Sequence, residues 1–362
     1  MRILFVRKGE SNSIFSYHYY FIQLLKDAFS TEVYYYDKHS TPVQKHSFLL
    51  VANVPKPSIL GYQRWYTTQL PKLIKDWQIE KVVYLNGYCP VLQNVRQIMI
   101  TDNLDVCNND LNGKNKWEQF CCHNILQSFN AVDKIAIYSE TAKEKIIQCY
   151  PQLREKTIVI SSASKEKISP LDWSQQSQIK EELTEGCEYF LSLVEQMTAD
   201  AIIHLLKAFS QFKKWQKSSM KLLILCNTSL KDNEDLNEKI NSYKYKADVQ
   251  LLFEISSEKL NQLLSAAYGF IYFSTKESAV LPILMAMQSE TPVITNVEMF
   301  GKKTPEESAF FLKDDSIDTL GQAMIGLYKA ESLRSILIKQ GRAHVKHFSY
   351  KDVLEKIKYV LN

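Results

Sequence analysis

Short apolar runs alternate with amphipathic segments along the whole chain. The first half contains seven runs that are rich in β-branched and aromatic residues and have the length of strands, at 3–7, 32–36, 48–52, 81–85, 98–101, 134–138 and 157–161. Between several of them lie helix-period patterns, at 16–29, 65–77, 116–130 and 140–149. This alternation predicts a parallel sheet with helices on both faces.

A second series of the same kind follows. Its strand-like runs lie at 189–194, 221–226, 249–253, 269–273 and 292–295, and its helical patterns at 199–216, 233–245, 256–267, 280–288, 316–329, 331–346 and 350–361. A chain of 362 residues is too long for one ordinary core. The pattern therefore predicts two successive doubly wound α/β domains.

The domain boundary is predicted within residues 162–178, a polar stretch that interrupts the alternation. We expect an N-terminal domain over 1–165, a C-terminal domain over 166–345, and a last helix within 346–362 that packs back toward the N-terminal domain. Because no long linker separates the two domains, they are expected to face each other across a cleft suited to small molecules.

Composition places the chain among globular proteins. It is 45% hydrophobic and 23% charged, its first residues are interpreted as a strand rather than a signal peptide, and no segment reaches the ~18 apolar residues of a membrane span. These features predict a cytoplasmic protein. The seven cysteines, an odd number without a CxxC motif, favour reduced thiols over a disulfide framework.

The net charge of +4 is too small to predict a nucleic-acid partner, and allows at most weak peripheral membrane contact through the more basic first half. The pair His344 and His347 is interpreted as a solvated helix face, because no third metal ligand is in view. The first strand is followed by Gly9 alone, without the GxGxxG fingerprint. We therefore expect no metal and no nicotinamide or flavin cofactor.

The candidate chemistry centres on residues 269–295, GFIYFSTKESAVLPILMAMQSETPVIT. An apolar strand is followed by the polar loop STKES, by a helix with Pro282 in its first turn, and by a second strand, PVIT. The loop thus lies at the carboxyl end of a parallel strand and faces a helix N-terminus. Ligands bind there in open α/β sheets, and unpaired N–H groups favour a phosphate or another anion.

This stretch resembles the donor domain of the retaining glycosyltransferases of the GT-B fold, family 4 or group 1. Their pattern is a strand, E-G-F-G-L-P-x-L-E-A-M, a turn and P-V-I. The chain agrees with it at Glu277, Leu281, Pro282, Leu284, Ala286, Met287, Pro292, Val293 and Ile294. The likeness extends from about residue 130 to the end. It implies two Rossmann-like doubly wound parallel-sheet domains facing a cleft, and a hexosyltransferase type of activity.

The resemblance also assigns roles to residues of the donor site. Glu277 takes the place of the glutamate that hydrogen-bonds donor-sugar hydroxyls and is the first catalytic candidate. Met285 stands where the family has a ribose-binding glutamate, and a thioether is a poor hydrogen-bond acceptor. The loop glycines that allow close approach of the donor are replaced by Ser278, Ala279 and Val280, followed by Leu281.

The family's diphosphate-binding Arg and Lys align with Glu195 and Asp200. At a separation of ~4 Å, each reversal of charge changes the interaction with a phosphate by several kcal/mol at an effective dielectric constant near 20. Stabilising the leaving group is usually the largest catalytic contribution. Lys276 and Lys302 are candidate substitute cations, although each is more simply interpreted as a surface lysine.

In the first domain, the resemblance places an acceptor-side loop at Lys8, Gly9, Glu10 and Ser11, with Asn86 at the end of another strand. The family's His-Asp pair near the acceptor aligns with Thr101 and Asp102, so that Asp102 is the second catalytic candidate.

Two functions remain open from the sequence. The first is a glycosyltransferase that moves a sugar, with retention, from a nucleotide sugar or a similar activated donor to an unidentified acceptor. The second is a catalytically impaired pseudo-glycosyltransferase that acts as a partner of another protein, a regulator or a sugar-binding scaffold.

Overall fold

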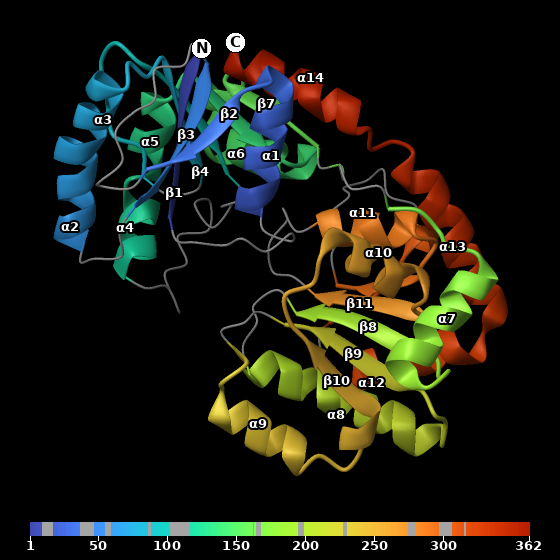
Figure 1. The fold of residues 1–362 in the computed structure, drawn as a ribbon. Coiled ribbons are helices and arrows are strands. Elements are labelled where there is room, and N and C mark those ends of the chain that lie inside the picture. The colour runs from blue at the N-terminus through green and yellow to red at the C-terminus, as the bar shows by residue number, and fades with distance from the viewer. Residues whose placement is uncertain are drawn as a thin grey trace. The chain divides into compact units, whose positions relative to one another are not determined.

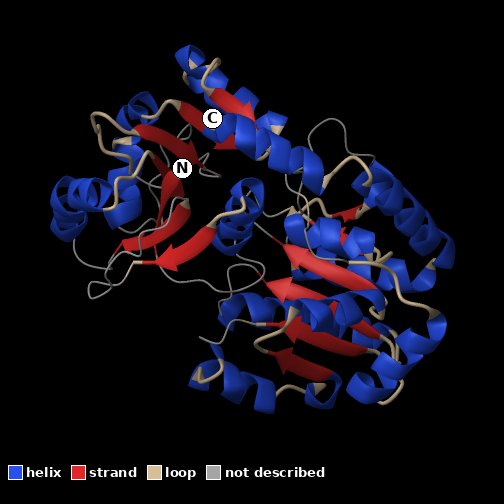
Figure 2. Cartoon of the chain, turned by 45° about the horizontal axis from the view of Figure 1, so that its top comes forward, coloured by secondary structure: helices blue, strands red, loops and turns tan. Residues whose placement is uncertain are grey.

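A computed structural model describes residues 1–8, 17–36, 47–54, 59–85, 88–101, 116–161, 163, 168–194, 199–226, 230–273, 280–296, 306–314 and 316–362. The chain forms two compact units (Figure 1). Unit 1 comprises Met1–Ser162 together with Tyr350–Asn362, and unit 2 comprises Ala163–Ser349. Each unit is an α/β domain built on its own parallel sheet (Figure 2).

The sheet of unit 1 has seven strands in the order β2-β3-β1-β4-β5-β6-β7. Their bounds are β1 Arg2–Lys8, β2 Glu32–Tyr35, β3 Phe48–Val54, β4 Lys81–Leu85, β5 Arg96–Ile100, β6 Lys134–Ile137 and β7 Thr157–Val159. All pairings are parallel, as the alternating pattern predicts. The central strands are buried on both faces, which explains why they are nearly continuous apolar runs.

The helices of unit 1 are α1 Tyr17–Phe29, α2 Ile59–Arg64, α3 Leu70–Asp76, α4 Lys116–His123, α5 Ile125–Ala131, α6 Glu140–Cys149 and α14 Tyr350–Leu361. The predicted helix 65–77 begins earlier and contains a π-helical turn, Trp65–Gln69. The predicted helix 116–130 is interrupted at Asn124, whose side-chain amide donates to the Phe120 carbonyl at 2.8 Å.

The last helix, α14, belongs to unit 1 although unit 2 precedes it in the chain. It buries Val353, Ile357, Val360 and Leu361 and packs beside α1. At its start, the Tyr350 hydroxyl donates to the Asp27 carboxylate at 2.7 Å. At its end, the first residues of three adjacent strands, Lys81, Arg96 and Lys134, donate to carbonyls of the last turn. Cations at this position also complement the helix dipole.

The sheet of unit 2 has six strands in the order β10-β9-β8-β11-β12-β13. They are β8 Tyr189–Val194, β9 Lys221–Leu225, β10 Val249–Leu252, β11 Gly269–Phe273, β12 Val293–Thr295 and β13 Phe310–Phe311. The helices are α7 Trp173–Thr184, α8 Ala199–Trp215, α9 Glu234–Asn241, α10 Ser257–Ser265, α11 Leu281–Gln288, α12 Ile317–Lys329 and α13 Glu331–Val345. Helices α8, α9 and α12 cover one face, and α7, α10 and α11 the other (Figure 1).

Two elements of unit 2 were not expected from the hydrophobic pattern. Helix α7 begins inside the polar stretch 162–178 and carries a capping box, in which Asp172 and Gln175 bond reciprocally across the first turn. It buries only Ile179 and Thr184, so the apolar period is weak. Strand β13 is too short to leave a pattern of its own.

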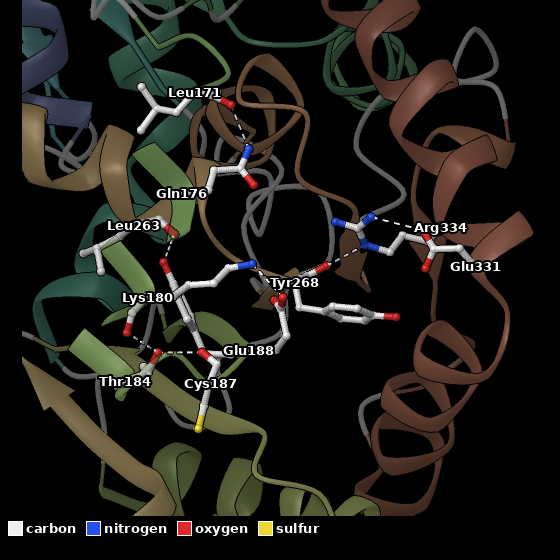
Figure 3. Close-up of polar contacts among 11 residues, drawn as sticks. Leu171, Gln176, Lys180, Thr184, Cys187, Glu188, Leu263, Tyr268, Glu331 and Arg334 are labelled. Atoms are coloured by element: carbon white, nitrogen blue, oxygen red, sulfur yellow. Dashed lines mark hydrogen bonds and ion pairs between the residues drawn. The ribbon is translucent and has the colours of Figure 1, made fainter. Parts of the chain in front are cut away.

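The amino ends of the central strands of unit 2 are occupied by structural contacts (Figure 3). The Lys180 ammonium lies 2.6 Å from the Glu188 carboxylate, and the Tyr189 hydroxyl donates to the Leu263 carbonyl at 2.7 Å. The Arg334 guanidinium donates to the Tyr268 carbonyl at 3.4 Å and covers the Tyr268 ring. These contacts connect α7, α10 and α13 to this edge of the sheet, which is opposite the edge where the strands have their carboxyl ends.

Candidate functional site

The strand order of unit 2 has a topological switch point at β8 and β11, and the predicted donor loop follows β11 in the sequence. From β8 the chain proceeds outward to β9 and β10, then returns to form β11 on the other side of β8 and continues to β12. Val194 and Phe273, the last residues of β8 and β11, are direct partners in the parallel register. Open α/β sheets bind ligands at the carboxyl ends of the strands where the order reverses.

Unit 1 has a switch point of the same type. Strand β1 lies between β3 and β4, so the chain changes direction between β1 and β4. Lys8 is the last residue of β1 and opens the predicted acceptor-side loop, while Leu85 ends β4 immediately before Asn86. Thr101 follows β5, is buried, and donates its N–H to the Ala136 carbonyl at 3.0 Å.

Helix α11 presents its N-terminus beside the β11 carboxyl end. Val280 occupies the N-cap position with helical dihedral angles and gives no side-chain cap, and Pro282 lies in the first turn. The first N–H groups of a helix have no intrahelical acceptor, and the helix dipole is positive at this end. The arrangement favours an anion at this edge.

The described donor-site candidates on α11 are buried. Val280, Leu281 and Met285 are 5%, 4% and 1% exposed. Every residue from Leu281 to Met287 is buried, because the helix lies between β11, β12, α10 and α13 and is apolar all round. The Met285 side chain is thus a core side chain, which explains an apolar residue at a position where the family pattern has a carboxylate.

Asp200 is the second residue of α8 and is exposed. A carboxylate in the first turn stabilises a helix through its dipole. The family pattern has a lysine at the position aligned with Asp200, so this chain carries the opposite charge at the start of α8.

The remaining predicted site residues lie outside the described residues. They are Asp102, Glu277, Glu195, Ser278, Ala279, Lys276, Lys302, Gly9, Glu10, Ser11 and Asn86. In the sequence these residues follow the strands β1, β4, β5, β8, β11 and β12, which are described. That they form one site at the carboxyl ends of these strands stays a prediction.

Two further side chains at this edge of unit 2 were not singled out by the motif comparison. Thr295 ends β12 and is fully buried, and Cys226 follows β9. Burial raises the pKa of the Cys226 thiol to about 12, so it remains protonated and is not a nucleophile at neutral pH. Their position as the last residues of predicted strands is the sequence signal that identifies such side chains.

Neither a metal site nor a membrane span is found in the described part of the chain. Within those ranges, no three His, Cys, Asp or Glu side chains come together in a way that would hold a metal ion. No helix among the described residues combines the length and apolar character needed to cross a bilayer. His344, expected on a solvated face, is instead buried, while His347 is exposed.

Comparison with protein families matches residues 175–344 to the family described as glycosyl transferases group 1. This segment starts in α7 and ends in α13, and so contains the β8, β11 and α11 switch point. Comparison with curated proteins gives no match.

Solved glycosyltransferase structures match the whole chain. WaaG, a glycosyltransferase involved in lipopolysaccharide biosynthesis, has a TM-score of 0.78 at 11% identity, with 99% of each chain covered. Anabaena Alr3699/HepE in complex with UDP and glucose has a TM-score of 0.70 at 13% identity, covering 99% of this chain and 98% of that one. Sucrose-phosphate synthase from Thermosynechococcus elongatus also has a TM-score of 0.70, at 14% identity, with the same coverage.

At these identities the solved structures establish the fold, and the family match supports glycosyl transfer as the general activity. The expected fold class is confirmed: each unit is a Rossmann-like domain with a parallel sheet. Residues 175–344 thus match the model of the group 1 glycosyl transferases, and the chain as a whole has the GT-B fold.

Proposed function

We propose that the chain is a retaining glycosyltransferase that moves a sugar from a nucleoside-diphosphate donor to an acceptor bound by the first domain. The observation that carries the proposal is the group 1 match over 175–344, a segment that contains the switch point between β8 and β11. A related fold holds UDP and glucose in the Anabaena protein, which supports a nucleotide-type donor.

In the proposed reaction, the bond between the anomeric carbon and the β-phosphate oxygen breaks. The acceptor hydroxyl bonds to that carbon on the same face and gives up its proton to the departing phosphate oxygen. The N-terminus of α11 would stabilise the growing negative charge on the leaving group. Glu277 would hold donor hydroxyls, Asp102 and the loop 8–11 would orient the acceptor, and Lys276 and Lys302 would supply the missing positive charge.

Two observations favour a second candidate, a catalytically impaired relative. Met285, at the ribose position, is 1% exposed and offers no hydrogen-bonding group. Asp200 is an exposed carboxylate at the diphosphate position. Such a protein would act as a partner or regulator of an active enzyme, or as a sugar-binding scaffold.

The test is a thermal-shift panel of nucleoside diphosphates and their sugars at millimolar concentration, followed by donor hydrolysis. An active enzyme should show a raised melting temperature with at least one of them, since a ligand that binds only the folded state stabilises it. Glu277→Ala should then abolish turnover, whereas Glu258→Ala, an exposed acid in the first turn of α10, should leave it unchanged. Failure of every nucleotide to shift the melt rejects the enzyme and favours the scaffold.

A further inference from the structure

A long stretch around α8 carries basic residues without any acid. Between Asp200 and Asp232 the sequence holds His204, Lys207, Lys213, Lys214, Lys217, Lys221 and Lys231, and neither Asp nor Glu. One face of α8 buries Ile202, Leu205, Leu206, Phe209 and Phe212 in the core. Its cations are therefore directed mostly to the opposite, outer face, and Lys207 and Lys214 are exposed.

Trp215, the last residue of α8, is 41% exposed in the middle of these cations. On its inner side the indole contacts Tyr328 and Phe212, with ring centroids 6.2 and 6.4 Å away. The Lys329 ammonium, from the end of α12, lies 4.7 Å from the indole centroid. The ring is thus held by the core of unit 2 and still open to solvent.

Tertiary packing adds lysines from two other elements, which are α12, with Lys329, and the turn 243–248. Lys213 is buried, with its ammonium 2.8 Å from Asp248 and 6.0 Å from the Tyr245 ring centroid, and so joins the 243–248 turn to α8. This turn carries the exposed Lys244 and Lys246. We call the resulting set the Trp215 surface: Trp215 with the exposed lysines 207, 214, 217, 244, 246 and 329.

Two acids close to this surface are Asp248, which is paired with lysines, and Asp318, which keeps its negative charge. Asp248 pairs with Lys213 and with Lys221, whose ammonium lies 3.2 Å away. Asp318 accepts a hydrogen bond from the Gln211 amide. Among the described residues, none of the six exposed lysines of the Trp215 surface forms an ion pair. The surface therefore has a local positive charge that the protein does not neutralise.

Several of these lysines line a groove between α8 and α12. One shallow hollow of about 700 Å³ is lined by His204, Lys207, Gln211, Lys214 and the start of α12, and a second, of about 520 Å³, by Lys214, Trp215, Ile325 and Lys329. Gln211, Lys214 and Asp318 line both. Each hollow also contains the Asp318 carboxylate, which accepts from the Gln211 amide, but its two lysine ammonium groups outnumber this one acid.

We propose that the Trp215 surface docks this chain on an anionic phospholipid membrane. Clusters of four to eight lysines on an amphipathic helix attract anionic headgroups, and tryptophan is the aromatic residue typical of the membrane interface. The headgroup phosphates lie in the α8–α12 groove beside the lysines, and Trp215 lies at the level of the headgroups. A nucleic acid is the less suitable occupant, because basic grooves for single strands stack successive bases on several aromatic side chains, whereas this surface has one exposed indole.

The first test is co-sedimentation with vesicles of phosphatidylcholine, with and without phosphatidylglycerol, at low and high salt. The protein should bind the anionic vesicles alone, and less at high salt. The triple variant Lys214→Gln, Lys217→Gln, Lys329→Gln should lower the partition coefficient by about tenfold or more. The matched control changes three exposed lysines of unit 1, Lys72→Gln, Lys75→Gln, Lys356→Gln, and should bind as the native protein does.

The outcomes separate the alternatives. Equal loss in both triple variants would mean that net charge, and not this surface, determines binding, and would overturn the proposal. So would a lack of binding to anionic vesicles at low salt, or tighter binding of a single-stranded oligonucleotide than of the vesicles. Melting temperatures equal to that of the native protein would show that each variant is folded.

The second test follows tryptophan fluorescence during vesicle titration. The emission should shift to shorter wavelength when Trp215 enters the interface, and Trp215→Phe should remove the shift. Trp173→Phe, which replaces an 81% exposed indole on α7, on the opposite face of the sheet, should retain it. A shift that persists without Trp215 and disappears without Trp173 would assign docking to the α7 face and reject the Trp215 surface.

Discussion

At the scale of single residues, Met285 and Asp200 differ in burial, although the family pattern assigns both positions to the donor site. Met285 is enclosed in the core of unit 2, whereas Asp200 is exposed at the start of α8. The sequence alignment treats both as lost ligand contacts. The structure shows that Met285 is a packing residue and that Asp200 is a surface charge. Substitutions of Met285 should therefore change stability, whereas substitutions of Asp200 should change ligand binding.

At Met285, introducing the family's carboxylate should destabilise the fold. Met285→Glu places an ionisable group in a site that is 1% exposed, and we expect a loss of about 3 kcal/mol or more in the free energy of unfolding. Met285→Leu, which keeps the volume, should cost about 1 kcal/mol or less. Urea titration measures both. A stable glutamate variant would mean that this side chain reaches solvent or a ligand.

At Asp200, restoring positive charge should improve nucleotide binding. The double variant Glu195→Arg with Asp200→Lys removes two repulsions and adds two attractions near the proposed diphosphate, and we expect at least about tenfold tighter binding of a nucleoside diphosphate by calorimetry. The control is Glu258→Lys, the same reversal in the first turn of α10. No gain in the double variant would show that these positions do not face the diphosphate.

At the scale of elements, all strands except β13 were predicted to within about two residues, because each central strand is buried on both faces and so is a continuous apolar run. Helix α7 was missed because it buries little, and the capping box at Asp172 and Gln175 was its clearer signal. The π-helical turn at Trp65–Gln69 has no periodic signature of its own. Of the candidate site, the position of the loops stays a prediction, and the burial of α11 on all sides was not predicted because it depends on contacts with β11, β12, α10 and α13.

The free energy of unfolding should depend on pH through His344 in helix α13. Burial, and then the neighbouring His347, lower the pKa of His344 from about 6.5 to about 4. The unfolded chain therefore binds the proton first as pH falls. Stability should decrease by about 2 kcal/mol between pH 6.5 and pH 4, and this contribution should be constant outside that window. Chemical denaturation at several pH values tests it, with His344→Gln expected to remove this dependence and the exposed His347→Gln to retain most of it.

Helix α14 should depend on the contact between Tyr350 and Asp27. Tyr350→Phe removes the donor of a 2.7 Å hydrogen bond and should cost about 1 to 2 kcal/mol, seen as faster hydrogen exchange in α14. Tyr359→Phe is the matched control, because Tyr359 is 65% exposed and its described contacts with Lys134 use the backbone carbonyl and the ring. Equal rates of hydrogen exchange in α14 of the two variants would show that the hydrogen bond between Tyr350 and Asp27 does not stabilise this helix.

At the scale of the whole molecule, the fold consists of two units, and one of them is discontinuous in sequence. Unit 1 is completed by α14, which contributes four buried apolar side chains after unit 2 has ended. The two units therefore differ in what a fragment must contain to fold.

Deleting residues 350–362 should destabilise unit 1 and spare unit 2. Exposing four buried side chains costs several kcal/mol, at about 2 kcal/mol for each. Calorimetry of the deletion variant should show a lowered transition for unit 1. The fragment 163–349 identifies the transition of unit 2, which should not move. A deletion variant with both transitions unchanged would show that α14 contributes little to unit 1.

By itself, the sequence determined the order of the strands and helices apart from α7 and β13, the parallel character of both sheets and the group 1 pattern, because periodicity and motif spacing are local properties of the chain. Only the tertiary structure decided the order of strands within each sheet, and with it the switch points between β1 and β4 and between β8 and β11. It also gathered lysines from residues 207 to 329 around Trp215. These features depend on contacts between residues far apart in the chain, which no local pattern encodes.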